Sequence, residues 1–151
     1  MKNIVFVCHG NICRSPAAEF IFKKAIIERG LESEFNVSSF ALSNEEIGND
    51  IYYPMKDELR RQGIPFTRRN AKRLTQEDYE DADVIFYMDS SNKRILDFYI
   101  NDHKRILHLI SEFSKDIPYV EDPWYTDRYT LVVNQLTQCV NDILDNLNKL
   151  F

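Results

Sequence analysis

The sequence predicts an α/β fold, a single-domain three-layer α/β/α structure with a four-stranded parallel sheet, and we expect residues 1–151 to form that one domain. Apolar runs of strand length alternate with helical patterns, which is typical of a parallel sheet covered on both faces. The first apolar run leads into a compact polar loop and then into a helix. A length of 151 residues suits one domain with a sizeable core.

Each element follows from a local pattern in the chain. Four apolar runs predict strands, and segments between and after them have helical spacing. Gly30 and Gly63 stand where the first two helices should end, and Pro65 reinforces the second stop. The apolar residues of the last segment predict a core-facing stripe. The expected strands are 4–7, 35–40, 84–88 and 105–109, and the expected helices are 16–29, 50–62, 90–100 and 128–150.

The composition restricts the class of function. Hydrophobic residues make up 44% of the chain and charged residues 28%, which fits a soluble globular protein. The net charge of −5 argues against nucleic acid or an anionic membrane as a partner. No apolar run is long enough to span a bilayer, and no secretory signal precedes the first strand, so we expect a cytoplasmic location. Three cysteines are a poor disulfide framework, and we expect no metal and no cofactor.

The segment from Cys8 to Ser15 carries the most specific signal. A strand, a compact loop and a helix form an anion site when backbone N–H groups converge on a phosphate-sized oxyanion. Cys8 supplies a nucleophile, and Arg14 supplies a charged planar fork for phosphate oxygens. Gly10 permits a tight turn, and Asn11 tolerates left-handed backbone. The sequence therefore predicts a phosphate-binding loop after the first strand, formed by His9, Gly10, Asn11, Ile12, Cys13, Arg14 and Ser15.

This loop resembles the phosphate-binding loop of low-molecular-weight protein tyrosine phosphatases, and the resemblance covers nearly the whole chain. The loop and the Asp-Pro segment near the C-terminus are its most specific parts. The resemblance implies hydrolysis of a phosphate monoester, with a phosphotyrosine protein or a small aryl phosphate as the substrate. Segments in the family's order and spacing are Ser39, 46–49, 63–65, 74–75, 88–92 and 122–125.

The resemblance implies a role for each reactive residue. Cys8 is expected to attack phosphorus and form a cysteinyl phosphate, which water then cleaves. The loop N–H groups, the helix N-terminus and Arg14 are expected to favour the thiolate, and the Ser15 hydroxyl can add a hydrogen bond. Arg14 is also expected to hold two phosphate oxygens in the transition state. Asp122 is the candidate general acid; Glu121 is the neighbouring rival, but the family pattern matches Asp122.

Other residues are expected to support this chemistry. The resemblance implies that Asn11, Ser15 and Ser39 support the loop. Trp124 and Tyr125 are expected to line the substrate cleft, and a place among core aromatics remains open for both.

The remaining cysteines have separate interpretations. In the family, Cys13 and Cys8 can form a reversible disulfide that shields the nucleophile from over-oxidation, and a simple buried thiol is the alternative for Cys13. Cys139 lies on the apolar helix pattern and is expected in the core.

Four positions depart from the family's pattern: His9, Ala41, Glu45 and Pro54. Glu45 stands where the family usually has an aromatic residue lining the cleft, and a carboxylate there would repel an acidic phosphopeptide. Phe40, Tyr52 or Tyr53 are candidates to supply the lost aromatic wall. His9 either adds positive charge when protonated or points to solvent. We hypothesise that the reaction is retained while the choice of substrate has shifted.

Other functions remain open at this point. An arsenate reductase would relay a disulfide through cysteines beyond the loop, where only Cys139 is available. Protein arginine phosphatases resemble this chain but carry threonine where Ile12 stands. A non-catalytic phosphate-binding or thiol-switch module is a third possibility, and the intact Arg14, Ser15 and Asp122 argue against it. We expect a monomer or a weak dimer.

Overall fold

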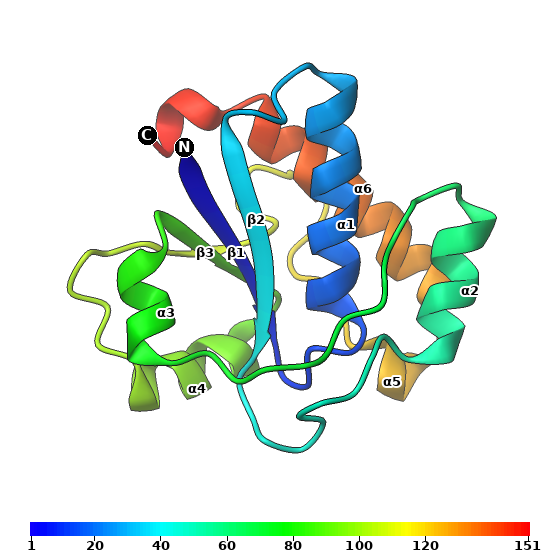
Figure 1. The fold of residues 1–151 in the computed structure, drawn as a ribbon, viewed down its shortest axis with the longest axis horizontal. Coiled ribbons are helices and arrows are strands. Elements are labelled where there is room, and N and C mark those ends of the chain that lie inside the picture. The colour runs from blue at the N-terminus through cyan, green and yellow to red at the C-terminus, as the bar shows by residue number, and fades with distance from the viewer.

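The computed structural model describes residues 1–151 as one α/β domain around a four-stranded sheet with the order β2-β1-β3-β4 (Figure 1). The strands are β1 (Lys2–Cys8), β2 (Phe35–Ala41), β3 (Val84–Tyr87) and β4 (Leu107–Leu109). All neighbouring strands are parallel, and β1 pairs with both β2 and β3. The central strand β1 therefore ends at the sheet edge where ligands of such sheets bind.

Helices cover both faces of the sheet (Figure 1). Helices α1, α2, α5 and α6 lie on one side, and α3 and α4 lie on the other. The side chains of β1 alternate accordingly: Ile4 and Phe6 belong to the larger core under α1 and α6, and Val5 and Val7 to the smaller core under α3 and α4. The helices are α1 (Arg14–Glu28), α2 (Tyr53–Arg61), α3 (Gln76–Asp81), α4 (Ser90–Tyr99), α5 (Pro123–Thr126) and α6 (Tyr129–Leu144), followed by a 3-10 helix at Leu147–Lys149.

The predicted fold class is confirmed, including the four parallel strands and the helices on both faces. The two glycine stops also lie at helix ends. Gly30 and Gly63 have φ angles of 69° and 71°, the left-handed conformation that glycine adopts without a Cβ penalty. Beyond Gly30, the Leu31 N–H donates to the Ile26 carbonyl at 2.7 Å and closes the last turn of α1.

The structure differs from the predicted elements where a helix is short or its end lacks a strong signal. Helices α3 and α5 were not predicted, because four to six residues give too little periodicity. Helix α2 begins at Tyr53 rather than at residue 50, with Pro54 in its first turn. Helix α6 ends at Leu144 rather than at 150, and the chain continues as a 3-10 turn in which Leu147 still packs on the core.

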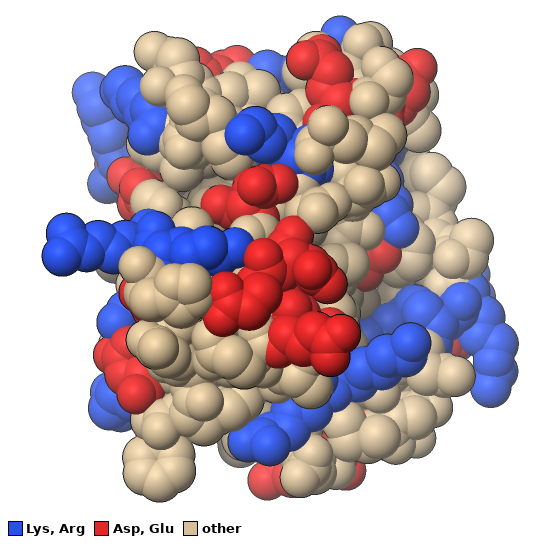
Figure 2. Space-filling view, turned by 60° about the vertical axis from the view of Figure 1, so that its left-hand side comes forward, with Lys and Arg blue, Asp and Glu red and all other residues tan.

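Acidic side chains gather on the α3 side of the molecule, as Figure 2 shows. Helix α3 contributes Glu77, Asp78, Glu80 and Asp81 to this face. None of these residues lines the pocket at the end of β1, so the acidic face and the pocket are separate features. None of the helices has the length and apolar character of a membrane span.

Candidate active site

Ser15, in the first turn of α1, presents two donors to the Cys8 sulfur at the end of β1. Strand β1 ends at Cys8 and α1 begins at Arg14, with no acidic residue in the first turn of the helix and no side chain capping its N–H groups. The Ser15 N–H donates to the Cys8 Sγ at 3.4 Å, and the Ser15 Oγ lies 3.0 Å from the same sulfur. A helix N-terminus and a hydroxyl therefore both face Cys8, which favours negative charge at that point.

Asn11 holds the loop from behind. It is fully buried and has a φ of 59°, a left-handed conformation that asparagine tolerates better than most residues. Its side-chain amide donates to the Ser15 Oγ at 2.7 Å and to the Ser39 Oγ at 3.0 Å. Ser39 donates in turn to Glu19 at 2.7 Å, and Arg69 donates to the Asn11 Oδ1. This hydrogen-bonded network fixes the Ser15 hydroxyl toward the sulfur.

Arg14 is held by acceptors on two other segments, one after β3 and one before α5. Its side chain is almost fully buried; Nη1 donates to the Asp89 Oδ2 at 2.6 Å and to the Val120 carbonyl at 2.9 Å. The Nη2 lies 3.6 Å from the Asp122 Oδ2. Burial opposes the charged form, but Cys8, Asp89 and Asp122 together raise the pKa of Arg14 above its ordinary value. The guanidinium is therefore a fixed positive charge beside the loop.

Asp122 and Glu121 face different environments, although they are adjacent in the chain. Asp122 caps the N-terminus of α5, where its Oδ1 accepts from the Trp124 N–H at 3.0 Å, and its side chain lines the pocket with Cys8. Glu121 instead pairs with Arg128 outside that pocket, and bonds to Thr126 and Arg128 hold its pKa below the ordinary value. Only Asp122 of the two is placed at the pocket.

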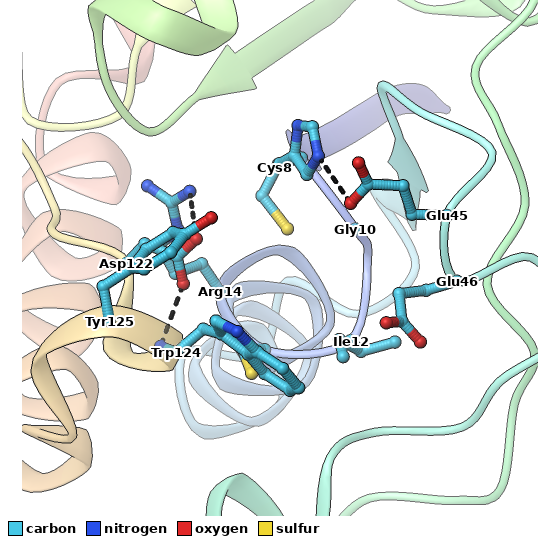
Figure 3. A pocket seen from close by; sticks show the side chains of 11 residues that line it. Cys8, Gly10, Ile12, Arg14, Glu45, Glu46, Asp122, Trp124 and Tyr125 are labelled. Atoms are coloured by element: carbon cyan, nitrogen blue, oxygen red, sulfur yellow. Dashed lines mark hydrogen bonds and ion pairs between the residues drawn. The ribbon is translucent and has the colours of Figure 1, made fainter.

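The pocket above Cys8 has two unlike walls (Figure 3). On one side are Asp122, Trp124 and the largely exposed Tyr125. On the other side are Glu45 and Glu46, with Ile12 between the two walls at the loop.

Aromatic contacts extend the first wall, and an ion pair forms part of the second. The Tyr52 ring packs against Trp124 with 4.8 Å between centroids, so Tyr52, rather than Phe40, is the aromatic that lies beside the cleft. Phe40 packs against the smaller core instead. On the acidic side, the His9 Nε2 lies 3.0 Å from the Glu45 Oε2, and both side chains are substantially exposed. His9 thus contacts Glu45 as well as solvent.

The other two cysteines are buried free thiols. Cys13 lies at the pocket floor; burial first, and then the nearby Cys8 and Asp122, raise its pKa well above the ordinary range of a thiol. Cys139 is fully buried on α6, and burial raises its pKa to about 11. Both side chains are therefore neutral thiols at physiological pH. No group of three or more His, Cys, Asp or Glu side chains is placed to hold a metal ion.

Three residues of the site were given no role by sequence reasoning, although Asp89 lies in the 88–92 segment that follows the family's pattern. Glu19 and Arg69 complete the network behind Asn11, and Asp89 holds Arg14. Glu19 and Arg69 carried no signal, because their partners lie 20 and 58 residues away in the chain. Asp89 stood directly after the apolar run of β3, at the carboxyl end where site residues of such sheets are expected.

The fold and the loop define this protein as an α/β protein with a cysteine-centred oxyanion cradle at the end of its first strand. The model of the family described as "Low molecular weight phosphotyrosine protein phosphatase" matches residues 3–151. The chain belongs to this family.

Individual relatives cover the same full length. A "Low molecular weight phosphotyrosine protein phosphatase" of Homo sapiens is 35% identical, over 95% of this chain and 94% of its own. The "Low molecular weight protein-tyrosine-phosphatase YfkJ" of Bacillus subtilis is 32% identical, over 99% of this chain and 97% of its own. A crystal structure of YfkJ from Bacillus subtilis matches with a TM-score of 0.93 and 30% identity, covering 99% of this chain and 96% of that one. The resemblance inferred from the loop is thereby confirmed.

Proposed function

We propose that the protein hydrolyses phosphotyrosine in proteins through a cysteinyl-phosphate intermediate. The observation that carries this proposal is the convergence of Cys8, Arg14 and Asp122 on one pocket, in a chain that belongs to a phosphotyrosine phosphatase family. The loop N–H groups and Arg14 bind the phosphate oxygens, so that the Cys8 sulfur faces phosphorus. Trp124 packs beside the aromatic ring of the substrate.

In the first step, the Cys8 thiolate attacks phosphorus and the bond to the tyrosine oxygen breaks. Asp122 delivers its proton to that oxygen, so tyrosine leaves as a neutral phenol. Arg14 and the loop N–H groups stabilise the charge spread over the equatorial oxygens. The 3.6 Å approach of Arg14 to Asp122 links the two groups that act on opposite ends of the breaking bond.

In the second step, water attacks the cysteinyl phosphate and the P–S bond breaks. Asp122, now a carboxylate, accepts a proton from the water, and inorganic phosphate leaves. The Ser15 hydroxyl, 3.0 Å from the sulfur, donates to the departing thiolate. Asn11 and Ser39 keep that hydroxyl in place.

Two further expectations belong to this proposal. Cys8 and Cys13 lie in the same pocket as free thiols, and a protective disulfide between them stays a prediction. We also infer that the protein works in the cytoplasm, because a reducing compartment keeps the Cys8 thiol free, and that it is a monomer or weak dimer.

The buried position of Cys139 argues against the arsenate reductase alternative, since a relay thiol must reach the loop cysteine. Cys139 is fully buried on α6 and does not line the pocket. The non-catalytic alternative differs from the proposal in a measurable way, because a phosphate-binding or thiol-switch module has no turnover.

The test is hydrolysis of para-nitrophenyl phosphate by the reduced protein in EDTA, followed by a series of aryl phosphates with poorer leaving groups. Cys8→Ser should abolish turnover. Asp122→Asn should slow poor leaving groups by roughly 10²-fold or more and good ones much less, because only a poor leaving group needs the proton. Glu121→Gln is the matched control and should leave this dependence unchanged. Turnover that survives Cys8→Ser, or an absence of turnover in folded wild type, would refute the proposal.

A further inference from the structure

The acidic wall of the cleft has no cationic side chain of its own. Glu45 is 69% exposed, and His9 is its only ionic partner. Glu46 accepts from the Asn49 amide at 2.6 Å and pairs with no lysine or arginine. By contrast, Asp50 just beyond them is paired with Lys56 at 2.7 Å. The cleft rim therefore presents two carboxylates, Glu45 and Glu46, which we call the acidic rim.

One of these two residues packs close to the loop. The Glu46 side chain lies against Gly10, where an added Cβ would sit 3.3 Å from the Glu46 Cγ. Gly10 is thus the residue that lets Glu46 approach the phosphate-binding loop. Figure 3 shows Glu45 and Glu46 across the cleft from Trp124. When the ring of a phosphotyrosine lies beside Trp124, the neighbouring residues of the substrate on the open side of the cleft therefore face the acidic rim.

The remaining charges of the pocket do not neutralise the rim. Arg14 is already held by Asp89 and lies near Asp122, and in the proposed function its guanidinium binds the substrate phosphate. The only ionic contact of His9 is with Glu45. A substrate phosphate carries two negative charges past the acidic rim, and an acidic residue next to the phosphotyrosine adds to that repulsion. A lysine or arginine in the same place is attracted by the rim, and this attraction offsets the repulsion between the rim and the phosphate.

We propose that the acidic rim makes the enzyme select phosphotyrosine flanked by lysine or arginine, an inference that rests on the proposed phosphatase function. The rim carries a carboxylate at position 45, where the family usually has an aromatic residue. It therefore discriminates between the residues next to the phosphotyrosine rather than contacting the phosphotyrosine ring. The discrimination is electrostatic, and the rim residues are exposed or partly exposed to solvent, which weakens their interactions. Each rim carboxylate should therefore change kcat/KM by about two- to five-fold. Together, they should favour a lysine-flanked over a glutamate-flanked peptide by roughly ten-fold.

The experiment compares two peptides that differ only at the residues on either side of phosphotyrosine, lysine in one and glutamate in the other. The ratio of their kcat/KM values is measured for wild type, Glu45→Gln, Glu46→Gln and the double variant. The matched control is Glu32→Gln/Glu77→Gln, which removes two exposed carboxylates outside the cleft. Its net charge equals that of the Glu45→Gln/Glu46→Gln variant. Para-nitrophenyl phosphate, which has no flanking residue, reports the chemistry separately.

We expect a ratio of roughly ten in wild type and in the control, falling to about two or less in the double variant. The wild-type ratio should also shrink in 0.5 M salt, at roughly a 4 Å Debye length. A wild-type ratio near one, or an unchanged ratio in the double variant, overturns the inference while turnover of para-nitrophenyl phosphate leaves the proposed function standing. A ratio that falls equally in the control assigns the effect to net charge and also overturns it. Absence of all turnover overturns both.

Discussion

Replacing Asn11 by alanine tests how far the phosphate-binding loop depends on one buried amide. Asn11 makes side-chain hydrogen bonds to Ser15, Ser39 and Arg69, and no part of it is exposed. It is also one of three residues other than glycine with a positive φ, at 59°. The substitution therefore removes three hydrogen bonds. It also places alanine, whose side chain cannot form a local hydrogen bond, in the left-handed backbone conformation.

The expected loss of unfolding free energy depends on which hydrogen bonds the partners of Asn11 retain. Ser15 remains bonded to Cys8, and Ser39 still donates to Glu19, so neither hydroxyl is left without a partner. Each lost bond then costs about 1 kcal/mol rather than a full desolvation penalty. Alanine in the left-handed region adds about 1 kcal/mol. The sum is roughly 4 kcal/mol of unfolding free energy, or a fall of roughly 10 °C in Tm for a chain of this size.

Urea unfolding of wild type and Asn11→Ala measures this loss, and Asn134→Ala, an exposed site on α6, is the control that should lose nothing. The kcat for para-nitrophenyl phosphate should fall about ten-fold or more, because the Ser15 hydroxyl loses the donor that orients it. A double-mutant cycle with Ser39→Ala should give a coupling energy of about 1 kcal/mol. A loss of stability below about 1 kcal/mol together with an unchanged kcat would show that the amide network does not hold the loop.

Three further outcomes are expected. Burial raises the pKa of Glu58, but its hydrogen bonds to Arg61, Gln62 and Thr130 outweigh burial, so its pKa in the folded protein lies below the ordinary 4.5. The ionised Glu58 therefore stabilises the fold above about pH 4.5, and this stabilisation is lost as the pH falls through the folded pKa. Glu58→Gln should make the free energy of unfolding fall less steeply at acid pH than in wild type. Iodoacetamide at pH 7.5 should leave Cys13 and Cys139 unlabelled until the protein unfolds, as peptide mass spectrometry would show, and rapid labelling of either in folded protein would contradict their burial. Phosphate should raise the Tm of wild type but not of Arg14→Lys, measured by calorimetry, and an equal rise in both would show that the bidentate fork is dispensable.

Sequence patterns predicted the parts of this molecule that are set by neighbours in the chain. The apolar run of β1, the glycine stops after α1 and α2, and the strand-loop-helix around Cys8 all arise from residues within about ten positions of one another. The capping box of Thr75 with Asp78 is equally local and was available as a signal for α3. Its absence from the prediction shows that a six-residue helix is better recognised by its cap than by its periodicity.

The contacts that complete the site are set by the tertiary fold, and no local pattern encodes them. His9 and Glu45 were each identified as departures from the family's pattern, one on the loop and one 36 residues later. Their pairing depends on the β2-to-α2 segment folding back over the loop, which places Glu46 against Gly10 as well. Two changes that looked independent in the sequence therefore belong to one wall of the cleft. Because an aromatic residue at position 45 would leave His9 without an anionic partner, the change at one position alters the electrostatic environment of the other.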